Sequence, residues 1–528
     1  MITASNLLSR VPSLFSDLAK ILAGDIDCSL KTLTKYEVDG SSYSIKPQAV
    51  IYPKNSTDIK YVLSFARDYK MPVIPRGNGK ARSGGSLGEG IILDMSRYFS
   101  QIRNINMIEN TVTVDAGVNV SSLLEKLHAW HYDIPLLSLE DKESTLGAVV
   151  ATKSASSSSF YHGTIREWIE GLTLVVDTGE EHHITDGITP SGRLLGIYQA
   201  VFPLLTEEGP TLRAVKPTSH DDATGYNLWS TSIGPRQLLD QLVGSEGTLG
   251  IITSITFRVS PHKPHSITTC IPITDIEMLP TYIDIAKYHK GEHIFLYDQT
   301  FMQLADRYHK TLVPFFADTA YVLLVTHTAT DEEKLNHLVQ TLRYALPVEG
   351  HSMKTLYNRQ DLERFINTDF LYLLTQEYTN NTLTPSNVGS GLIVTIPQLP
   401  ALLPELGKYL DSLGNLYMFT GNVGSGHISV ITLFDPQSKS YDDDILLYTK
   451  NIFSILKKYN GGISAVGGEG LARTPFLSYV YNDKALLVFK KIKDAWDPLS
   501  ILNPGKKLGT TTTYLQHHLL RTPKERRS

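Results

Sequence analysis

The chain has 528 residues, of which 41% are hydrophobic and 20% are charged, the ordinary composition of a globular protein. This length exceeds what one hydrophobic core supports, so we expect at least two domains. The formal net charge of -5 gives no reason to expect nucleic acid or an anionic surface as the main partner.

The first half of the chain has the pattern of a βαβ unit, strand, helix and strand within a short stretch. Apolar runs predict strands at residues 49–53, 72–75, 90–94, 111–115 and 172–177. After the first of these strands, Ser56 is expected to cap a helix whose apolar residues recur with a 3.6-residue period. A glycine-rich loop, residues 76–88, follows the second strand.

The second half alternates strand-like and helix-like segments from about residue 266 onward. Strands are predicted at residues 266–273, 321–326, 392–397 and 416–420, and helices at residues 276–287, 332–346, 399–413 and 443–459. Two strand–helix–strand units of this kind indicate an antiparallel sheet backed by helices. The sequence therefore predicts the α+β fold class.

The two cysteines, Cys28 and Cys270, are too far apart in the sequence for a CxxC pair or an iron–sulfur ligand set. The absence of a disulfide framework fits a reducing compartment. The first 22 residues lack the features of a signal peptide, and no stretch approaches the roughly 20 apolar residues of a membrane span. We therefore expect a cytoplasmic protein. The tail after Thr513 is basic, so weak contact with a membrane surface is the alternative to a solvated tail.

The glycine-rich loop has the composition of a phosphate-binding turn. A pyrophosphate needs closely approaching backbone N–H groups, which glycine permits because it lacks a Cβ. Glycines stand at positions 77, 79, 84, 85 and 88, beside Arg76, Lys80 and Arg82. The spacing is neither that of a Rossmann motif nor that of a Walker A loop, so the loop alone is compatible with an ordinary turn.

Segments along the chain resemble, in the same order, the motifs of the vanillyl-alcohol-oxidase-type flavoproteins, the family of p-cresol methylhydroxylase (PCMH). The matching segments are residues 53–59, 75–79, 93–96, 145–148, 162–166, 222–228, 243–253 and 497–506. The resemblance implies FAD as cofactor. It also implies an FAD-binding domain of two α/β subdomains and a substrate or cap domain built on the helix-backed antiparallel sheet.

The resemblance divides the chain into five parts. They are an N-terminal helical extension (residues 1–44), an FAD-binding PCMH-type domain (45–263), an FAD-linked oxidase C-terminal domain (264–470), a segment that returns to the FAD domain (471–510) and the basic tail (511–528).

The FAD contacts implied by the resemblance come from the glycine-rich loops. Backbone amides of Gly77, Asn78 and Gly79 would hold the pyrophosphate, and Thr248 would bond phosphate or the flavin ring. The expected FAD-binding residues are Arg76, Gly77, Asn78, Gly79, Lys80, Ser83, Gly84, Thr145, Leu146, Gly147, His162, Gly163, Gly244, Glu246, Gly247, Thr248, Gly250, Ile251, Ile252, Asn503 and Lys506. For some of these glycines, turn geometry without direct contact is an equal alternative.

Asn78 predicts how the cofactor is attached. Relatives that bind FAD covalently through this loop carry a histidine where Asn78 stands, and an asparagine cannot form that bond. We therefore expect non-covalent FAD. His162 is a second position from which a covalent link is conceivable, although a structural histidine is the simpler interpretation.

The resemblance is nearest to the D-lactate and D-2-hydroxyacid dehydrogenase branch, in which two histidines and a glutamate hold a divalent metal. In this chain Asn422 and Ser429 replace the histidines, and Val466 replaces the glutamate. Neutral Asn, Ser and Val cannot substitute for that ligand set, so no catalytic metal is expected.

Oxidation of an alcohol by a flavin needs a base near the hydroxyl group. His427 is the first candidate, because histidine titrates near neutral pH, with a structural histidine as the alternative. Tyr226 and Asn422 are candidate orienting groups, and Glu469 is a further polar candidate. A hydroxyacid substrate would need an arginine for its carboxylate, and the available arginines are Arg359, Arg364 and Arg473.

These features favour an FAD-dependent dehydrogenase or oxidase acting on the CH–OH group of a 2-hydroxyacid, alcohol or sugar, by hydride transfer to flavin N5. Oxygen, a quinone and a protein all remain open as electron acceptor. One alternative is an FAD-binding protein with decayed catalysis that acts as a binding or regulatory module. Another is a respiratory dehydrogenase docked on a membrane through the basic tail.

Overall fold

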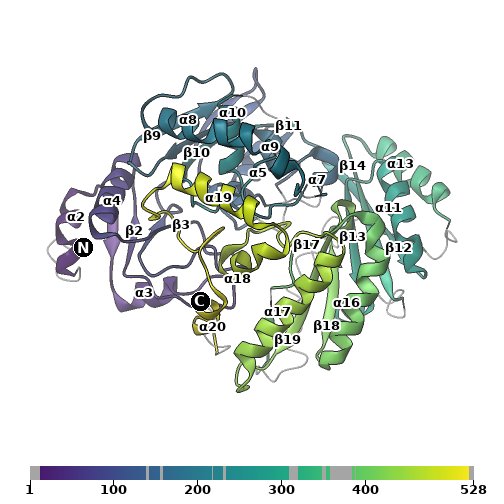
Figure 1. The fold of residues 1–528 in the computed structure, drawn as a ribbon. Coiled ribbons are helices and arrows are strands. Elements are labelled where there is room, and N and C mark those ends of the chain that lie inside the picture. The colour runs from purple at the N-terminus through teal and green to yellow at the C-terminus, as the bar shows by residue number, and fades with distance from the viewer. Residues whose placement is uncertain are drawn as a thin grey trace.

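A computed structural model describes residues 12–137, 142–154, 158–216, 218–219, 221–229, 234–308, 319–347, 353–356, 383–386 and 388–521. In Figure 1 the N-terminal sheets, purple to blue, occupy the left and top of the molecule, and a green sheet with its helices occupies the right. The yellow C-terminal segment runs back between them.

The first sheet, called the parallel sheet below, has the strand order β1-β2-β4-β3. Its strands are β1 (Asp25–Asp27), β2 (Ala49–Tyr52), β3 (Val73–Arg76) and β4 (Ile91–Asp94). Strands β2 and β3 both run parallel to β4, and β1 pairs antiparallel with β2. Every residue of β2 and β4 is buried, as expected for continuous apolar runs in a covered parallel sheet. Because β1 precedes residue 45, the expected N-terminal helical extension contributes a strand besides α2 (Ser16–Ile21) and α3 (Leu30–Tyr36).

Helix α4 (Ser56–Tyr69) connects β2 to β3 and packs its apolar face on the parallel sheet. Its N-cap is Asn55, whose side-chain oxygen accepts a hydrogen bond from the Asp58 backbone N–H at 3.0 Å. The prediction that Ser56 caps this helix was therefore wrong by one residue. Both residue types cap helices well, and the extended backbone of Asn55 gives it the role.

The second sheet is five-stranded and antiparallel, with the order β5-β6-β10-β8-β9. Its strands are β5 (Ile102–Asn106), β6 (Thr111–Asp115), β8 (Ile169–Val175), β9 (Glu181–Thr185) and β10 (Ile251–Arg258). The helices that share its core are α5 (Val120–His128), α6 (Leu146–Ala151), α8 (Gly192–Glu207), α10 (Arg236–Leu242) and α19 (Asp483–Trp496). Helix α19 comes from the C-terminal part of the chain, so this core is completed only by residues near the C-terminus.

The third large sheet is eight-stranded and antiparallel, which confirms the predicted helix-backed sheet and the α+β class. Its strands are β12 (His265–Ile273), β13 (His293–Asp298), β14 (Tyr321–Ala329), β15 (Lys354–Leu356), β16 (Thr384–Ser386), β17 (Leu392–Ile393), β18 (Tyr417–Gly421) and β19 (His427–Phe434). One face is covered by α11 (Leu279–Tyr288), α13 (Glu332–Ala345), α16 (Leu399–Leu413) and α17 (Tyr441–Lys458). Helix α12 (Gln299–Tyr308) packs on the opposite face.

One predicted strand of this sheet differs from the structure, and other strands were not predicted. The strand expected at residues 392–397 is limited to β17, and a 3-10 turn at Ile396–Gln398 follows it. Thr395 and Gln398 form a capping box there, which ends the extended backbone. Strands β13 and β19 were not predicted, and β19 begins at the candidate base His427.

The chain returns to the parallel sheet near its C-terminus. The backbone N–H of Val73 donates to the carbonyl of Ile501, and the N–H of Asn503 donates to the carbonyl of Val73. The tail is not simply solvated up to residue 521, because helix α20 (Thr512–His517) contacts α17 and Leu519 pairs with Tyr43. Among the described helices, none is long and apolar enough to cross a membrane.

Candidate functional site

The glycine-rich loop begins where β3 ends, at the carboxyl edge of the parallel sheet. A Cβ at Gly77 would collide with the Thr145 hydroxyl, so the loop approaches the N-terminus of α6 as closely as a glycine allows. Gly79 has a positive φ of 70°, which glycine adopts without strain. The sequence therefore has glycine at the two positions where the backbone requires it.

Side chains of the same loop contact the start of α5 and the segment that precedes α6. The Asn78 amide donates to Oδ1 of Asn119 at 2.9 Å and to the carbonyl of Glu143. Lys80 forms a salt bridge of 2.7 Å with Glu143. The N–H of Gly147 donates to the carbonyl of Ala116, whose Cβ would lie 2.8 Å from a Cβ at Gly147.

The second predicted loop, residues 244–250, lies against the last turn of α6 and against the parallel sheet. Gly244 has a φ of 86°, and its N–H donates to the carbonyl of Val150 at 2.9 Å. A Cβ at Gly247 would lie 3.0 Å from Pro75, directly before the first loop. The loop ends at Gly250, where Ile251 and Ile252 begin β10.

The C-terminal segment joins the two glycine loops. The Asn503 amide donates to the carbonyls of Gly85, at 3.0 Å, and Glu246, at 2.7 Å. Lys506 is buried and donates to the carbonyl of Leu87, and burial lowers the pKa of Lys506 to about 8. Ser83 bonds the carbonyl of Gly467, and Gly84 lies against Leu471. The loops at residues 76–88, 145–147, 244–250 and 503–506 thus converge, and this glycine-lined cradle fits a dinucleotide pyrophosphate.

Gly77→Ala is expected to lower the FAD content of the purified protein, because the added methyl group would displace either the loop or Thr145. The ratio of flavin to protein absorbance measures this effect. Gly196→Ala in α8 is the matched control, since its Cβ would meet nothing nearer than the Arg193 guanidinium at 3.9 Å. Equal FAD contents in the two variants would contradict the role of the cradle.

Three of the expected FAD-binding side chains, described next, form hydrogen bonds or ion pairs with other protein groups. The Arg76 guanidinium donates to the carbonyls of Tyr36 and Val38, at 3.1 and 2.8 Å. His162, before Gly163 at the end of α7 (Ser159–His162), lies 3.1 Å from Glu292. Thr248 bonds the Tyr226 hydroxyl at 2.7 Å. Direct contact of these side chains with FAD stays a prediction.

Two other catalytic candidates, Tyr226, which lines the cavity described below, and Glu469, have partners other than His427. Tyr226 is buried in the core of the five-stranded sheet, and its hydroxyl group is hydrogen-bonded to the Thr248 hydroxyl. Burial raises the pKa of Tyr226 well above the usual range. Glu469 is fully buried and pairs with Lys507, which also lies 3.4 Å from Glu246. Burial raises the pKa of Glu469 to about 8 against the opposing charge of Lys507. The Glu246–Lys507–Glu469 network therefore connects the second glycine loop to the segment after β19.

His427 and Asn422 are brought together in a buried polar group, called the interface cluster below. Its members are Ser159, Asp221, Asn422, Ser425 and His427. Nε2 of His427 lies 3.8 Å from Oδ2 of Asp221, which accepts a hydrogen bond from Ser159. Ser159 also lies 3.0 Å from the hydroxyl of Ser425. Ser159 and Asp221 come from the N-terminal half, and the other members come from the turn between β18 and β19.

The imidazole of His427 is neutral at physiological pH. Burial lowers the pKa of His427 to about 4, with Asp221 opposing and Lys153 reinforcing that shift. Among the described residues, its Nε2 atom is buried and makes no hydrogen bond. A neutral, buried imidazole with a carboxylate nearby can accept a proton and be stabilised once charged.

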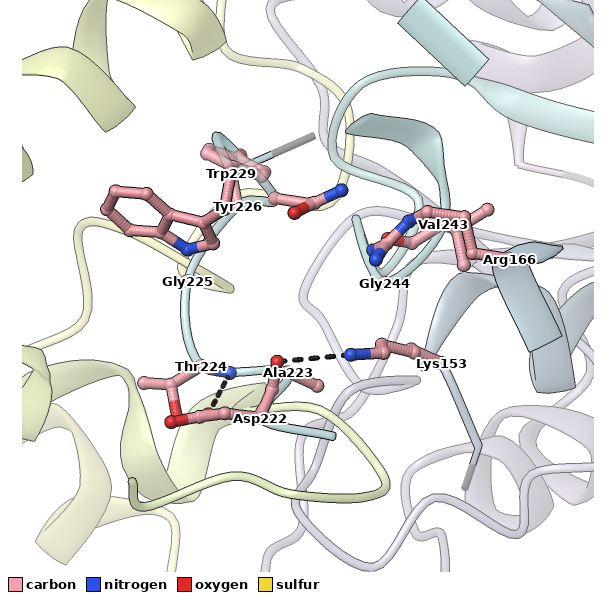
Figure 2. Close-up of a pocket in the computed structure, with 11 residues that line it drawn as sticks. Lys153, Arg166, Asp222, Ala223, Thr224, Gly225, Tyr226, Trp229, Val243 and Gly244 are labelled. Carbon is pink, nitrogen blue, oxygen red and sulfur yellow. Dashed lines mark hydrogen bonds between the residues drawn. The ribbon is translucent and has the colours of Figure 1, made fainter. Parts of the chain in front are cut away.

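A small, partly open cavity is lined by two cations, Lys153 and Arg166, and includes Asp222, the neighbour of Asp221 in the interface cluster. Figure 2 shows both side chains pointing toward the segment that contains Asp222 and Gly225. Nζ of Lys153 donates to the carbonyl of Asp222 at 3.1 Å. Burial lowers the pKa of Lys153 to about 7 and that of Arg166 to about 10. Such a cavity suits an anionic group, whose charge would favour the protonated form of both side chains.

The positions that carry metal ligands in the D-2-hydroxyacid dehydrogenases have other roles here. The Ser429 hydroxyl accepts a hydrogen bond from the Gly391 N–H at 3.1 Å. Asn422 belongs to the interface cluster, and the Val466 carbonyl accepts from Arg473. These donors do not form a set that suits a divalent metal.

Sequence reasoning missed Lys153, Ser159, Asp221 and Lys507. Asp221 directly precedes the matching segment at residues 222–228, and Lys153 follows the one at residues 145–148. Their contacts with the other candidate residues depend on the packing of distant segments, which the local sequence does not show.

Comparison with known proteins gives two matching domain families. Residues 47–185 match an FAD binding domain, and residues 289–507 match the C-terminal domain of FAD linked oxidases. A D-2-hydroxyglutarate dehydrogenase of Stutzerimonas stutzeri is 22% identical, over 94% of this chain and 98% of its own length. The glycolate oxidase subunit GlcD of Bacillus subtilis is 23% identical, over 89% and 91% of the two chains.

Some relatives are longer. The chain spans about half the length of the D-2-hydroxyglutarate dehydrogenase of Escherichia coli, with 23% identity over 92% of this chain and 50% of that protein. Among solved structures, a 4-ethylphenol oxidase from Gulosibacter chungangensis superposes with a TM-score of 0.67 at 14% identity, covering 96% and 97% of the two chains. An alkyldihydroxyacetonephosphate synthase superposes with a TM-score of 0.65, also at 14% identity, over 94% of this chain and 85% of that one. These likenesses show a shared fold.

Proposed function

Since the chain belongs to the FAD-linked oxidoreductases of the vanillyl-alcohol-oxidase type, we propose that it oxidises the CH–OH group of a small 2-hydroxyacid. The observation that carries this proposal is the cation-lined cavity beside the interface cluster. The curated relatives named above are a 2-hydroxyglutarate dehydrogenase and a glycolate oxidase subunit, and both names refer to 2-hydroxycarboxylic acids.

His427 is the proposed base. When bound, FAD supplies the hydride acceptor, so the protein must remove the hydroxyl proton and hold the substrate carbon near the flavin. The neutral His427 imidazole accepts that proton, and Asp221, 3.8 Å away, stabilises the imidazolium that results. Asn422 and Ser425 orient the substrate hydroxyl from the same turn.

Lys153 and Arg166 are the proposed partners of the substrate carboxylate. Of the arginines considered from sequence, Arg473 is buried and donates to the carbonyls of Val466 and Gly468, while Arg359 and Arg364 lie outside the described residues. Lys153 and Arg166 line the cavity. Arg166 also donates to the carbonyls of Asp240 and Val243, both at 3.3 Å, and Lys153 acts on His427 electrostatically.

The test is anaerobic reduction of the bound flavin by a panel of 2-hydroxyacids, alditols and sugars, followed as loss of flavin absorbance. At least one 2-hydroxyacid is expected to bleach the flavin. Bleaching by an alditol or sugar alone would overturn the substrate class, and flavin that no compound reduces would support the binding-module alternative. Adding oxygen or a quinone to the reduced protein then distinguishes the electron acceptors.

Non-covalent FAD is expected because Asn78 offers no atom for a flavin bond and its amide is engaged by Asn119. Acid precipitation of the purified protein should leave the yellow colour in the supernatant. A yellow pellet would contradict this expectation and would indicate a link through another residue such as His162.

A further inference from the structure

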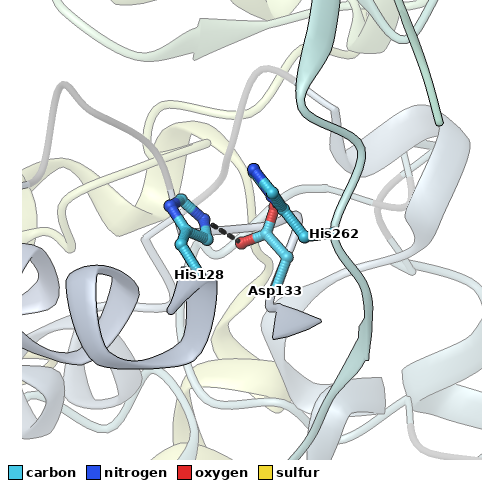
Figure 3. A group of neighbouring side chains, drawn as sticks. All are labelled: His128, Asp133 and His262. Carbon is cyan, nitrogen blue, oxygen red and sulfur yellow. Dashed lines mark hydrogen bonds and ion pairs between the residues drawn. The ribbon is translucent and has the colours of Figure 1, made fainter. Parts of the chain in front are cut away.

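A second group of polar side chains lies away from the glycine loops, where the chain leaves the five-stranded sheet. It consists of His128 in the last turn of α5, Asp133 in β7 (Tyr132–Asp133) and His262, which directly follows β11 (Ser260–Pro261). Strands β7 and β11 pair antiparallel, which brings Asp133 opposite Ser260. Figure 3 shows the three side chains side by side, with the ion pair between His128 and Asp133 drawn as a dashed line.

The distances within this group are those of metal ligands. Nε2 of His128 lies 3.2 Å from Oδ1 of Asp133, and Nδ1 of His262 lies 3.5 Å from Oδ2. One ligand atom from each of the three residues lies within 4.8 Å of the other two. Ligands about 2.0–2.1 Å from a tetrahedral zinc ion stand roughly 3.3 Å apart, so rotation of the two imidazole rings out of their stack would complete a site.

The two imidazole rings stack with centroids 3.9 Å apart and an angle of 27° between their planes. If both histidines were protonated, they would place two positive charges in contact with one carboxylate. Two neutral imidazoles and a carboxylate are instead the ligand set that a borderline dication such as Zn²⁺ binds. The side chains are 29%, 23% and 14% exposed for His128, Asp133 and His262, so water can occupy a fourth position.

We propose that His128, Asp133 and His262 bind a Zn²⁺ ion that fastens the segment joining the five-stranded sheet to the eight-stranded sheet. This site is separate from the altered positions 422, 429 and 466, where no catalytic metal is expected. Its role is structural, because none of its three residues belongs to the interface cluster or the glycine loops.

The position of His262 explains what the ion would hold. Its neighbour Lys263 forms a salt bridge of 2.5 Å with Glu292, which also lies 3.1 Å from His162 of α7. Although burial opposes it, hydrogen bonds from His162 and Lys263 lower the pKa of Glu292 to about 2. Strand β12 of the eight-stranded sheet begins at His265. A metal at His262 would therefore hold the start of this connection against α5 and β7, next to an ion-pair network that joins the two halves.

The test uses the full-length protein with FAD bound and Zn²⁺ itself as the probe, in competition with a chromogenic chelator. One equivalent of Zn²⁺ is expected to bind, and His262→Gln or Asp133→Asn should lose about 10–100-fold or more in affinity, since changes even to groups that only support metal ligands cost that much. Zn²⁺ should also raise the unfolding temperature of the wild type and not that of His262→Gln.

His265→Gln is the matched control, because His265 is a nearby and partly exposed histidine whose partner, Glu332, lies 3.7 Å away. It should keep wild-type zinc affinity. Flavin content and circular dichroism report whether each variant is folded. Failure of the wild type to bind Zn²⁺, or equal binding by the wild type and His262→Gln, would overturn the proposal. Neither result depends on which substrate the flavin oxidises.

Discussion

Replacing His427 with asparagine is expected to slow reduction of the flavin by substrate by about 10²–10⁴-fold, the range typical of a lost general base. The reason is that His427 is neutral at physiological pH, because burial lowers its pKa to about 4, and lies 3.8 Å from Asp221. Asparagine is polar and similar in size but cannot accept the proton. The measurement is the anaerobic rate of flavin bleaching in a stopped-flow instrument.

His183→Gln is the control for this experiment, because His183 lies in β9 with an exposed hydrogen bond to Thr173. Substrate should reduce the flavin of this variant at the wild-type rate. A His427→Asn rate within a few-fold of wild type, with FAD still bound, would show that His427 is a structural histidine.

The stability of the His427→Asn variant gives a second readout. The pKa of His427 is about 4 in the folded protein and near its usual 6.5 in the unfolded chain. The unfolded state therefore binds more protons between these values, and the stability supplied by the neutral histidine is complete above pH 6.5 and is lost as the pH falls to about 4. This pH-dependent part of the unfolding free energy should be absent from the variant.

Lys507→Met is expected to destabilise the protein by about 3–5 kcal/mol, because it removes the cation from a buried charge network. Lys507 is fully buried, and it pairs with Glu469 and lies 3.4 Å from Glu246. It also donates to the carbonyls of Ala223 and Gly225, at 3.2 and 3.0 Å. Both carboxylates and both carbonyls would lose this partner. Urea denaturation measures the difference in unfolding free energy.

Two further variants test the cause of this loss. Adding Glu469→Gln to Lys507→Met removes a carboxyl group that would otherwise be buried without its cation, so part of the lost stability should return. Lys490→Met is the surface control, because Lys490 pairs with Asp494 on the surface of α19 and such exposed pairs contribute about 0–1 kcal/mol. Equal losses for Lys507→Met and Lys490→Met would contradict the importance of the buried network.

The glycine cradle could be predicted only in part from local sequence. The positive φ of Gly79 is a property of that residue itself, whereas the close approach at Gly77 depends on Thr145, which comes from a distant segment. Local sequence also predicts β2, β4 and α4, whose apolar patterns match their buried faces. The cap of α4 was misplaced by one residue because Asn55 and Ser56 are equally good caps in sequence.

The partners of the candidate side chains could not be predicted, because they come from distant parts of the chain. His427 and Asp221 are separated by more than 200 residues, and Lys507 joins Glu246 of one loop to Glu469 of another. Glu469 was considered as a catalytic group from sequence, whereas its carboxylate lies in that buried network. Likewise, neither His128 nor His262 stands in a motif, and only the pairing of β7 with β11 brings them together.

The central claim is an FAD oxidoreductase whose substrate is deprotonated by His427 without a metal at positions 422, 429 and 466. The most direct test is the anaerobic rate of flavin reduction by substrate before and after exhaustive chelation of divalent ions. We expect chelation to leave the rate unchanged, both in the wild type and in His262→Gln, because Asn422, Ser429 and Val466 do not form a ligand set. A rate that falls on chelation in both proteins and returns when Zn²⁺ or Mn²⁺ is added would contradict the claim.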